Sequence, residues 1–386
     1  MGLWPRIKGK AEVKAVSKAE EEFSKSLYEV IKKSAKKDNI LFSPYSVTVV
    51  LTMLSEGARG ETLTMMKKKM HLPEAETLRA GYRDIIPALR TNERFTLDTA
   101  NTAFVMKEFQ VLEEFKTCLQ ENYHAHMSSL DFTENEKAAR TINDWVKTQT
   151  RDKITDLIPT DSLNALTRLV LVNAVYFKAD WAAQFEKDRT VPGRFWVTET
   201  ESKEVEMMSM KGHKMDFARL DQLDSSMVEL PYKGNRIVMQ LILPGERTGV
   251  YDLENKLAEV DLPSLFSQNK KDIKVDLRLP RFKLSHSLTL SDSLKQMGME
   301  DMFNEDKADL SGITGENDLY VSSVLQKVFV EVNEEGSEAT AATAEVTRCL
   351  PPLNQKFNVD HPFLFIIRDK LTGMILFQGR VVDPSA

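Results

Sequence analysis

Residues 331–350 of the chain read EVNEEGSEATAATAEVTRCL. Acidic residues and Gly336 come first, and small side chains then follow almost without a break from Ser337 to Ala344. None of these small side chains can anchor a hydrophobic core on its own. A flexible linker would have a similar composition. This stretch, however, leads back into two strongly apolar segments, which linkers rarely do, so a second interpretation is needed.

Read as a β-strand, the same stretch has one face that could be buried. Alternate residues of a strand share a face, and this face carries mostly small side chains: Ser337, Ala339, Ala341, Thr343, Glu345 and Thr347. Glu345 is the costly member, because a buried carboxylate must be protonated or stay near solvent. The opposite face would carry Glu338, Thr340, Ala342 and Ala344. With Gly336 as a hinge, the stretch could be an exposed loop in one state and a central strand in another.

The first third of the chain is predicted to be mainly helical. Residues 18–37 place apolar side chains at three- and four-residue spacing, as an amphipathic helix does. Ser43 can cap a second helix whose first turn holds Pro44. That helix is apolar nearly all round, so we expect it to be buried. Residues 137–149 predict a further amphipathic helix.

Strands dominate from about residue 168. The first is a long apolar run, Arg168–Phe177, and Lys233-Gly234-Asn235 predicts the turn of a hairpin. The other expected strands are residues 227–230, 237–243, 274–284, 329–332, 363–367 and 374–377. Helices followed by strands are typical of an α+β fold. Because no repeat or linker divides the chain, we predict one domain over residues 1–386.

Composition narrows the choice of partner and compartment. The net charge is -6 and no basic domain is evident, which argues against a nucleic-acid partner. No apolar run reaches the roughly 18 residues of a membrane span, and the N-terminus carries no signal peptide. Cys118 and Cys349 do not make a disulfide framework. We expect a leaderless, cytoplasmic protein with no membrane partner, or an extracellular one if a signal peptide was removed, and we expect a monomer.

Catalytic and metal-binding motifs are absent from the sequence. It contains no GxxxxGK[ST] phosphate loop, no HExxH zinc helix and no GxSxG nucleophile elbow. His124 and His126 could share a strand face and ligate a metal, but a polar turn explains them better. A methionine-rich stretch is better explained as core than as a ligand set; it holds Met207, Met208, Met210 and Met215. We expect no enzyme, no metal and no cofactor.

Five segments, in family order, resemble the serpin family of protease inhibitors. They are NILFSPYSV at 39–47, LSEGARGET at 54–62, NAVYFK at 173–178 with Trp181 and Phe185, EVNEEG at 331–336, and DHPF at 360–363. The resemblance covers nearly the whole chain. It implies the serpin fold, an α+β domain with three β-sheets and eight or nine helices.

The resemblance also implies a mechanism. A protease would attack an exposed reactive-centre loop and form a covalent acyl-enzyme. The freed loop would then insert into the central sheet as a new strand, a form of strand addition for which serpins are themselves a known example. This suicide-substrate reaction would trap the protease. The loop and its hinge would occupy residues 334–352.

Inhibitory serpins resemble one another in having a hinge of small residues. Here the hinge would be Glu334, Glu335, Gly336, Ser337, Glu338, Ala339, Thr340, Ala341, Ala342 and Thr343. Non-inhibitory relatives often carry bulky, charged or proline residues there. Inhibition is therefore the favoured interpretation, and a non-inhibitory serpin that acts as a binding or chaperone protein is the alternative.

The family also has a buried polar cluster that controls opening of the sheet. The resemblance places this cluster at Asn39, Ser43, Ser46, Asn173 and Gln326. The family usually has His at the position of Gln326. Because Gln also donates and accepts hydrogen bonds, the network could survive this change.

The scissile bond would lie in the region Thr347, Arg348, Cys349, Leu350 and Pro351. Counting forward from the hinge with the family spacing gives Leu350-Pro351, and counting back from the return strand points to Arg348-Cys349. Arg348 would favour the thiolate form of Cys349, with an inert exposed cysteine as the plain alternative.

The class of the target protease stays open. Arg348 would attract a trypsin-like serine protease. Papain-like cysteine proteases prefer an apolar residue just before the one at the cut, and Val346 would serve for cleavage after Thr347. Both classes of protease are therefore expected partners.

Overall fold

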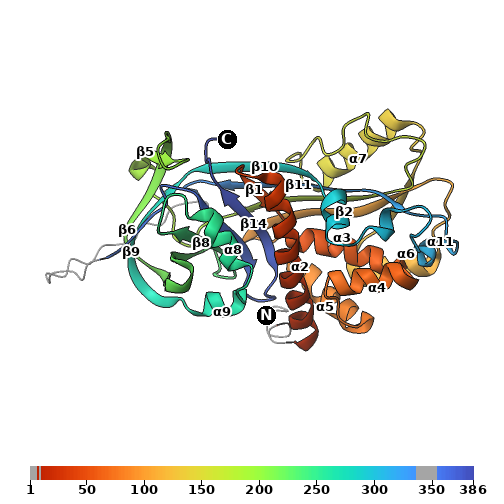
Figure 1. The fold of residues 1–386 in the computed structure, drawn as a ribbon, viewed down its shortest axis with the longest axis horizontal. Coiled ribbons are helices and arrows are strands. Elements are labelled where there is room, and N and C mark those ends of the chain that lie inside the picture. The colour runs from red at the N-terminus through yellow and green to blue at the C-terminus, as the bar shows by residue number, and fades with distance from the viewer. Residues whose placement is uncertain (1–6, 8–9, 336–353) are drawn as a thin grey trace.

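A computed structural model describes residues 7, 10–335 and 354–386 of the chain (Figure 1). Of the predicted hinge, Glu334 and Glu335 are described. The remaining hinge residues and the whole predicted scissile region, Thr347 to Pro351, lie outside the described residues.

One sheet has five strands in the order β10-β11-β4-β2-β3. The bounds of these strands are β10 Phe282–Thr289, β11 Val321–Val332, β4 Leu169–Ala179, β2 Phe95–Met106 and β3 Met127–Leu130. β11 and β4, the strands at its centre, run parallel to each other, whereas β4 pairs with β2 and β11 with β10 in the antiparallel sense.

The other sheet has nine strands in the order β1-β14-β13-β8-β7-β6-β9-β12, with β5 paired to β6. The bounds are β1 Ile40–Phe42, β14 Ile375–Val381, β13 Phe363–Asp369, β8 Ile237–Pro244, β7 Ser225–Pro231, β6 Ser202–Leu220, β9 Lys270–Pro280, β12 Gln355–Asn358 and β5 Val191–Trp196. The long strand β6 pairs with β5 through its first part and with β7 through its last. Two of the three sheets implied by the resemblance are therefore joined by hydrogen bonds through β6.

Ten α-helices lie in the described part of the chain. They are α2 Ala11–Ala35, α3 Pro44–Gly57, α4 Gly60–Lys69, α5 Ala75–Ala88, α6 Glu113–Tyr123, α7 Asn135–Gln149, α8 Val250–Leu257, α9 Leu262–Ser267, α10 Ser291–Gln296 and α11 Ser311–Thr314. The last three are six residues long or shorter, and eight or nine helices were expected. The α+β class is as predicted.

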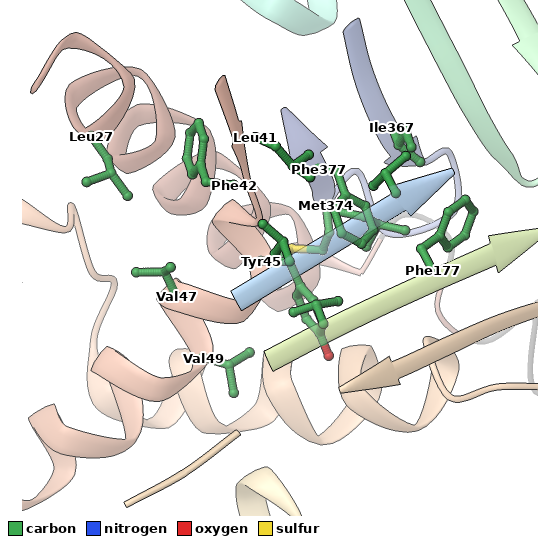
Figure 2. Close-up of a cluster of buried hydrophobic side chains, with 14 of the residues drawn as sticks. Leu27, Leu41, Phe42, Tyr45, Val47, Val49, Phe177, Ile367, Met374 and Phe377 are labelled. Atoms are coloured by element: carbon green, nitrogen blue, oxygen red, sulfur yellow. The ribbon is translucent and has the colours of Figure 1, made fainter. Parts of the chain in front are cut away.

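Helices cover both faces of the five-stranded sheet. Figure 1 shows α7 on one side and α3, α4 and α5 on the other. The main core lies on the α3 side, where Tyr45, Val47 and Val49 pack near Phe177 of β4 and Phe377 of β14 (Figure 2). Nearly every residue of α3 is buried. This confirms the prediction that α3 is a buried helix, and the four methionines of β6 are buried core residues as expected.

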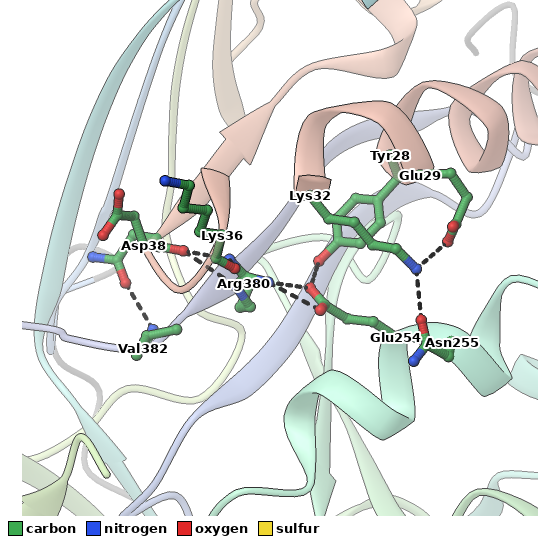
Figure 3. Close-up of polar contacts among 10 residues, drawn as sticks. Tyr28, Glu29, Lys32, Lys36, Asp38, Glu254, Asn255, Arg380 and Val382 are labelled. Atoms are coloured by element: carbon green, nitrogen blue, oxygen red, sulfur yellow. Dashed lines mark hydrogen bonds and ion pairs between the residues drawn. The ribbon is translucent and has the colours of Figure 1, made fainter. Parts of the chain in front are cut away.

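A buried ion pair joins β14 to α8, and a hydrogen bond from α2 to the same carboxylate attaches that helix to it. Arg380 of β14 donates two hydrogen bonds of 2.9 Å to Glu254 of α8, and Tyr28 of α2 donates to the same carboxylate (Figure 3). Burial raises the pKa of the Tyr28 hydroxyl well above its ordinary value, so this group stays protonated and remains a donor. The side chain of Arg380 is only 1% exposed. Its remaining donors bind backbone carbonyls of Lys36 and Asp38.

Several local predictions are confirmed. Ser43 caps α3 by accepting a hydrogen bond from the backbone N–H of Ser46, and Pro44 is the first helical residue. The hairpin of β7 and β8 turns through Gly234 and Asn235, both with positive φ angles. His124 ends α6 in the left-handed conformation, which agrees with the turn predicted there.

Several strands differ from the predictions: β1, β2, β3, β5, β6 and β12 were not predicted, and residues 274–284 were predicted as one strand. Strand β2 was not predicted, because α3 and α7 cover its two faces and its polar residues therefore do not alternate with apolar ones. Residues 274–284, predicted as one strand, belong to β9 and β10 in different sheets. The buried residues Leu279 and Phe282 are three positions apart, so the strand period of two is interrupted at Arg281.

Candidate functional site

Three amide side chains form a polar line across the centre of the five-stranded sheet. In the strand register Asn101 of β2 stands opposite Asn173 of β4, and Asn173 stands opposite Gln326 of β11. Asn173 Nδ2 donates to Asn101 Oδ1 at 2.8 Å, and Gln326 Nε2 donates to Asn173 Oδ1 at 2.6 Å. We call these three residues the amide ladder. Each step of the ladder joins two neighbouring strands.

The N-terminus of α3 makes hydrogen bonds to the amide ladder. The backbone N–H of Ser43 donates to Gln326 Oε1 at 3.1 Å, and Gln326 Nε2 donates back to the Ser43 carbonyl at 3.1 Å. The Ser46 hydroxyl donates to Asn101 Oδ1 at 2.6 Å and accepts from Asn173 Nδ2. Asn173, Gln326, Ser43 and Ser46 are all fully buried. The amides therefore replace water as partners of the first turn of α3.

Four of the five residues expected in the polar cluster are thus in mutual contact, and Asn39 is elsewhere. Its side chain binds the C-terminal segment, with Nδ2 donating to the Asp383 carbonyl at 2.7 Å and Oδ1 accepting from the N–H groups of Val382 and Asp383. Asn101 takes the fifth place in the cluster. It was missed because it lies in the unpredicted strand β2 and because cross-strand register cannot be read from sequence spacing.

The ladder crosses the seam between β4 and β11. These parallel strands are paired from Leu169 and Val321 to Phe177 and Val330. Most side chains of β4 along this seam are apolar and buried on both faces. A strand inserted here would have to break the hydrogen bond between Gln326 and Asn173, which is the side-chain contact across the seam at its middle.

The C-terminal end of β11 is attached at the predicted hinge. Trp181 Nε1 donates to the Asn333 carbonyl at 2.9 Å, and the Trp181 ring stacks on Tyr232 with centroids 4.3 Å apart. Glu334 is buried; it accepts a hydrogen bond of 2.7 Å from Thr190 and pairs with Arg281 at 3.4 Å. These contacts hold Asn333 and the first hinge residue, Glu334, against the main body.

Glu335 is the last described residue before the gap, and it is exposed. Lys187 pairs with its carboxylate and thereby lowers its pKa below the ordinary value. Its carbonyl accepts a hydrogen bond of 3.1 Å from Gln184. A cavity of about 320 Å³ opens beside these residues, lined by Lys187, Thr190, Glu206, Arg281, Asn333, Glu334 and Glu335. The hinge residues that are described thus border an open cavity at the end of the seam.

The chain resumes at Asn354, on the other sheet. Asn354 Nδ2 donates to Asp276 Oδ1 at 2.9 Å, and the same oxygen accepts from the Gly212 N–H at 2.7 Å. Strand β12 then pairs in parallel with β9. Residues 336–353 therefore connect two anchored ends that belong to different sheets.

The described residues offer little support for other kinds of site. They contain no group of three or more His, Cys, Asp or Glu that could hold a metal ion. No helix among residues 10–335 and 354–386 is long and apolar enough to cross a membrane. Cys118 is half-buried, and burial raises the pKa of its thiol.

Comparison with known proteins identifies the family. The family model described as "Serpin (serine protease inhibitor)" matches residues 18–384. Human leukocyte elastase inhibitor is 37% identical over 377 residues, which cover 96% of this chain and 99% of that protein. Human Serpin B3 is 38% identical over 391 residues, covering 96% of this chain and 100% of that protein.

Solved structures of similar fold support this family assignment. The crystal structure of Serpin48 from the insect Tenebrio molitor superposes with a TM-score of 0.86 at 36% sequence identity, covering 97% of this chain and 100% of that one. Uncleaved ovalbumin has the same TM-score of 0.86 at 28% identity, covering 96% of this chain and 100% of that one. The fold and the family resemblance of the five segments are therefore confirmed, and the chain belongs to the serpin family.

Proposed function

We propose that this chain inhibits proteases as a suicide substrate, by insertion of its cleaved loop between β4 and β11. The observation that carries the proposal is the seam itself: two central strands that run parallel, with a hinge anchored at the end of one of them. An inserted strand would run antiparallel to both neighbours and would be hydrogen-bonded on both edges.

The chemical step belongs to the protease. Its serine or cysteine nucleophile would attack the carbonyl carbon of the scissile bond, form an ester or thioester with the new C-terminus, and release the following residue as a free amine. The chain supplies the bait bond and the strand that moves. Its membership of a family of protease inhibitors and the small residues of its hinge support inhibition over a binding or chaperone role.

Energy for the movement comes from the new strand. Each backbone hydrogen bond contributes about 1 kcal/mol net, so about a dozen new bonds would outweigh the side-chain contacts that must break. Those contacts are the Gln326–Asn173 step of the ladder, the Glu334–Arg281 pair and the Trp181 hydrogen bond. The backbone hydrogen bonds between β4 and β11 would also break, but the inserted strand would replace them with bonds on both of its edges, so the dozen is a net gain.

Proteases of two classes are the expected targets. Cleavage after Arg348 suits a trypsin-like serine protease, and cleavage after Thr347 suits a papain-like cysteine protease. Human leukocyte elastase inhibitor, a relative, is named for a different target, elastase. The identity of residue 348 therefore separates the expected specificity of this chain from what that name suggests.

The test is incubation with trypsin and with a papain-like protease, followed by a denaturing gel and mass analysis of the released C-terminal fragment. A complex heavier than the 43.9 kDa chain that survives denaturation supports trapping. The fragment would begin at Cys349, Arg348 or Pro351, depending on the bond that is cut. Clean cleavage without a complex by either enzyme would overturn the proposal and leave a non-inhibitory serpin.

Two hinge variants make the test specific for insertion. Ala341 lies on the face of the predicted strand that would be buried, and Ala342 lies on the other face. Ala341→Arg should be cleaved without forming a complex, since its charge would have to be buried. Ala342→Arg introduces the same charge one residue later and should still form the complex. Equal behaviour of the two variants would contradict insertion in this register.

A further inference from the structure

Within the described residues, one buried carboxyl group, that of Glu20, has no positively charged partner. The buried acidic residues of this part of the chain are Glu20, Glu21, Asp98, Glu229, Glu254, Glu334 and Asp369. All except Glu20 pair with a lysine or an arginine, at distances from 2.6 Å (Glu229 to Lys370) to 3.4 Å (Glu334 to Arg281). The usual way of compensating a buried carboxylate is therefore missing at this one position.

Glu20 occupies an apolar position of α2. The buried face of this helix carries Val16 and Phe23, and Glu20 lies between them at spacings of four and three residues. At this level α2 packs against β14 (Figure 1). The turn before β14 comes so close that a Cβ atom on Gly373 would lie 2.5 Å from the hydroxyl oxygen of Ser17. The Glu20 side chain is fully buried in this interface.

The hydrogen bonds of Glu20 go to the first residue of β14. The backbone N–H of Ile375 donates to both carboxyl oxygens, at 2.9 Å and 3.2 Å. One backbone donor offsets only part of the cost of burying a full charge, whereas a protonated carboxyl group can keep this hydrogen bond without that cost. Burial accordingly raises the pKa of Glu20 well above its ordinary value of 4.5, against the opposing effect of the Ile375 hydrogen bond.

The titratable groups near Glu20 supply no positive charge. Burial, and also the charge of Glu20, raise the pKa of the hydroxyls of Tyr45 in α3 and Tyr82 in α5, so neither hydroxyl ionises near neutral pH. Glu21, the next residue of α2, raises the pKa of Glu20 further, and its own carboxylate pairs with Lys25 at 3.0 Å. From β14 only the backbone N–H group faces the carboxyl group.

We propose that Glu20 forms a pH-sensitive contact between α2 and β14. In its neutral form the carboxyl group accepts from Ile375 and lets the helix pack against the strand. Loss of the proton places an unpaired charge in the interface and weakens it. Neither the seam nor the hinge takes part in this contact, so the inference does not rest on the proposed function.

The sign of the effect follows from the two states of the chain. Folded Glu20 binds its proton more tightly than unfolded Glu20, which is solvated. The stability that this proton contributes is fully present below about pH 4.5 and is lost as the pH rises towards the raised pKa of the folded state. This direction is opposite to that of an ion-paired carboxylate, which loses stability in acid.

Comparison with Glu20→Gln tests the proposal, because the variant lacks this one titratable group and imitates the neutral carboxyl in size. Urea unfolding between pH 5 and pH 8 gives the unfolding equilibrium constant of each chain. The ratio of the two constants changes tenfold for each pH unit over which only the folded chain keeps the proton. We expect the unfolding constant of the natural chain to rise at least about tenfold relative to that of Glu20→Gln across this range.

Glu22→Gln is the matched control, since it makes the same change on the same helix at a side chain that is 41% exposed. Its ratio to the natural chain should change little with pH. Hydrogen exchange at the Ile375 N–H, corrected for its intrinsic pH dependence, should accelerate with pH in the natural chain but not in Glu20→Gln.

An NMR titration of chain labelled with carbon-13 in its glutamate carboxyl groups gives a direct second readout. The signal that is absent from Glu20→Gln should titrate well above pH 4.5. The proposal is overturned if that signal titrates near pH 4.5, if the ratio of unfolding constants for Glu20→Gln does not change with pH, or if the ratio for Glu22→Gln changes equally.

Discussion

Replacing Gln326 by Leu tests whether the amide ladder closes the sheet. The substitution replaces the polar amide by an apolar group of similar size and so removes both the donor and the acceptor. Two buried groups lose their partner in the described structure: the Ser43 N–H and Asn173 Oδ1. The Ser43 carbonyl keeps a bond of 3.2 Å from the Val47 N–H, so it is not orphaned.

The magnitude follows from these two groups. A buried polar group without a partner costs about 1–3 kcal/mol, so Gln326→Leu should lower the free energy of unfolding by about 2–6 kcal/mol. Urea unfolding followed by circular dichroism measures the loss, provided that the m-value is unchanged. Hydrogen exchange should also become faster for the N–H groups of β4 and β11 near position 173.

Gln326→His is the matched control. A neutral imidazole has one acceptor and one donor, which are the two roles needed for the Ser43 N–H and Asn173 Oδ1. We expect this variant to lose less than half as much stability as Gln326→Leu. The reasoning is refuted if Gln326→Leu lies within about 0.5 kcal/mol of the natural chain, a difference typical of surface sites, or if the two variants lose equal amounts.

Three further outcomes are expected. Arg380→Met should lower the free energy of unfolding, measured in urea, by about 3–5 kcal/mol, because it leaves the buried Glu254 without its ion-pair partner. The double variant with Glu254→Leu should recover part of this loss. No recovery would argue against the ion pair of Figure 3. Trp181→Phe should abolish most of the change in tryptophan emission on loop cleavage, since Trp181 donates to the carbonyl of Asn333, the residue before the hinge. An emission change in the variant as large as in the natural chain would show that Trp181 is not its source. Lys107 and Thr133 hold the pKa of Asp131 at about 2, against 3.8 ordinarily. The ionised carboxylate therefore adds stability above about pH 4 that is lost as pH falls towards 2, and Lys107→Met should raise this pKa in an NMR titration; an unmoved pKa would rule out Lys107 as the cause.

The sequence predicted correctly those features that depend on a single helix or turn. The cap at Ser43 with Pro44 after it predicted the start of α3, and the Gly234-Asn235 turn predicted the β7–β8 hairpin. The all-round apolar composition of α3 predicted its burial at the centre of the molecule. These features depend on neighbours within a few residues, which the sequence displays directly.

The sequence did not predict the features that depend on contacts between segments far apart in the chain. Strand β2 is covered on both faces, so its pattern lacked the alternation that reveals a strand, and Asn101 was missed with it. The resemblance placed Asn39 in the polar cluster, but it lies just before β1, which pairs with β14, and its side chain binds the C-terminal segment instead.

The central claim is that cleavage of the loop adds a strand to the five-stranded sheet. The most direct measurement compares the thermal unfolding midpoint of the chain before and after its loop is cut, with Ala341→Arg treated in the same way. About a dozen new hydrogen bonds at about 1 kcal/mol each, at roughly 2 °C per kcal/mol for a large domain, predict a rise on the order of 20 °C for the natural chain and a much smaller one for the variant. A midpoint that stays the same or falls after cleavage of the natural chain would contradict insertion.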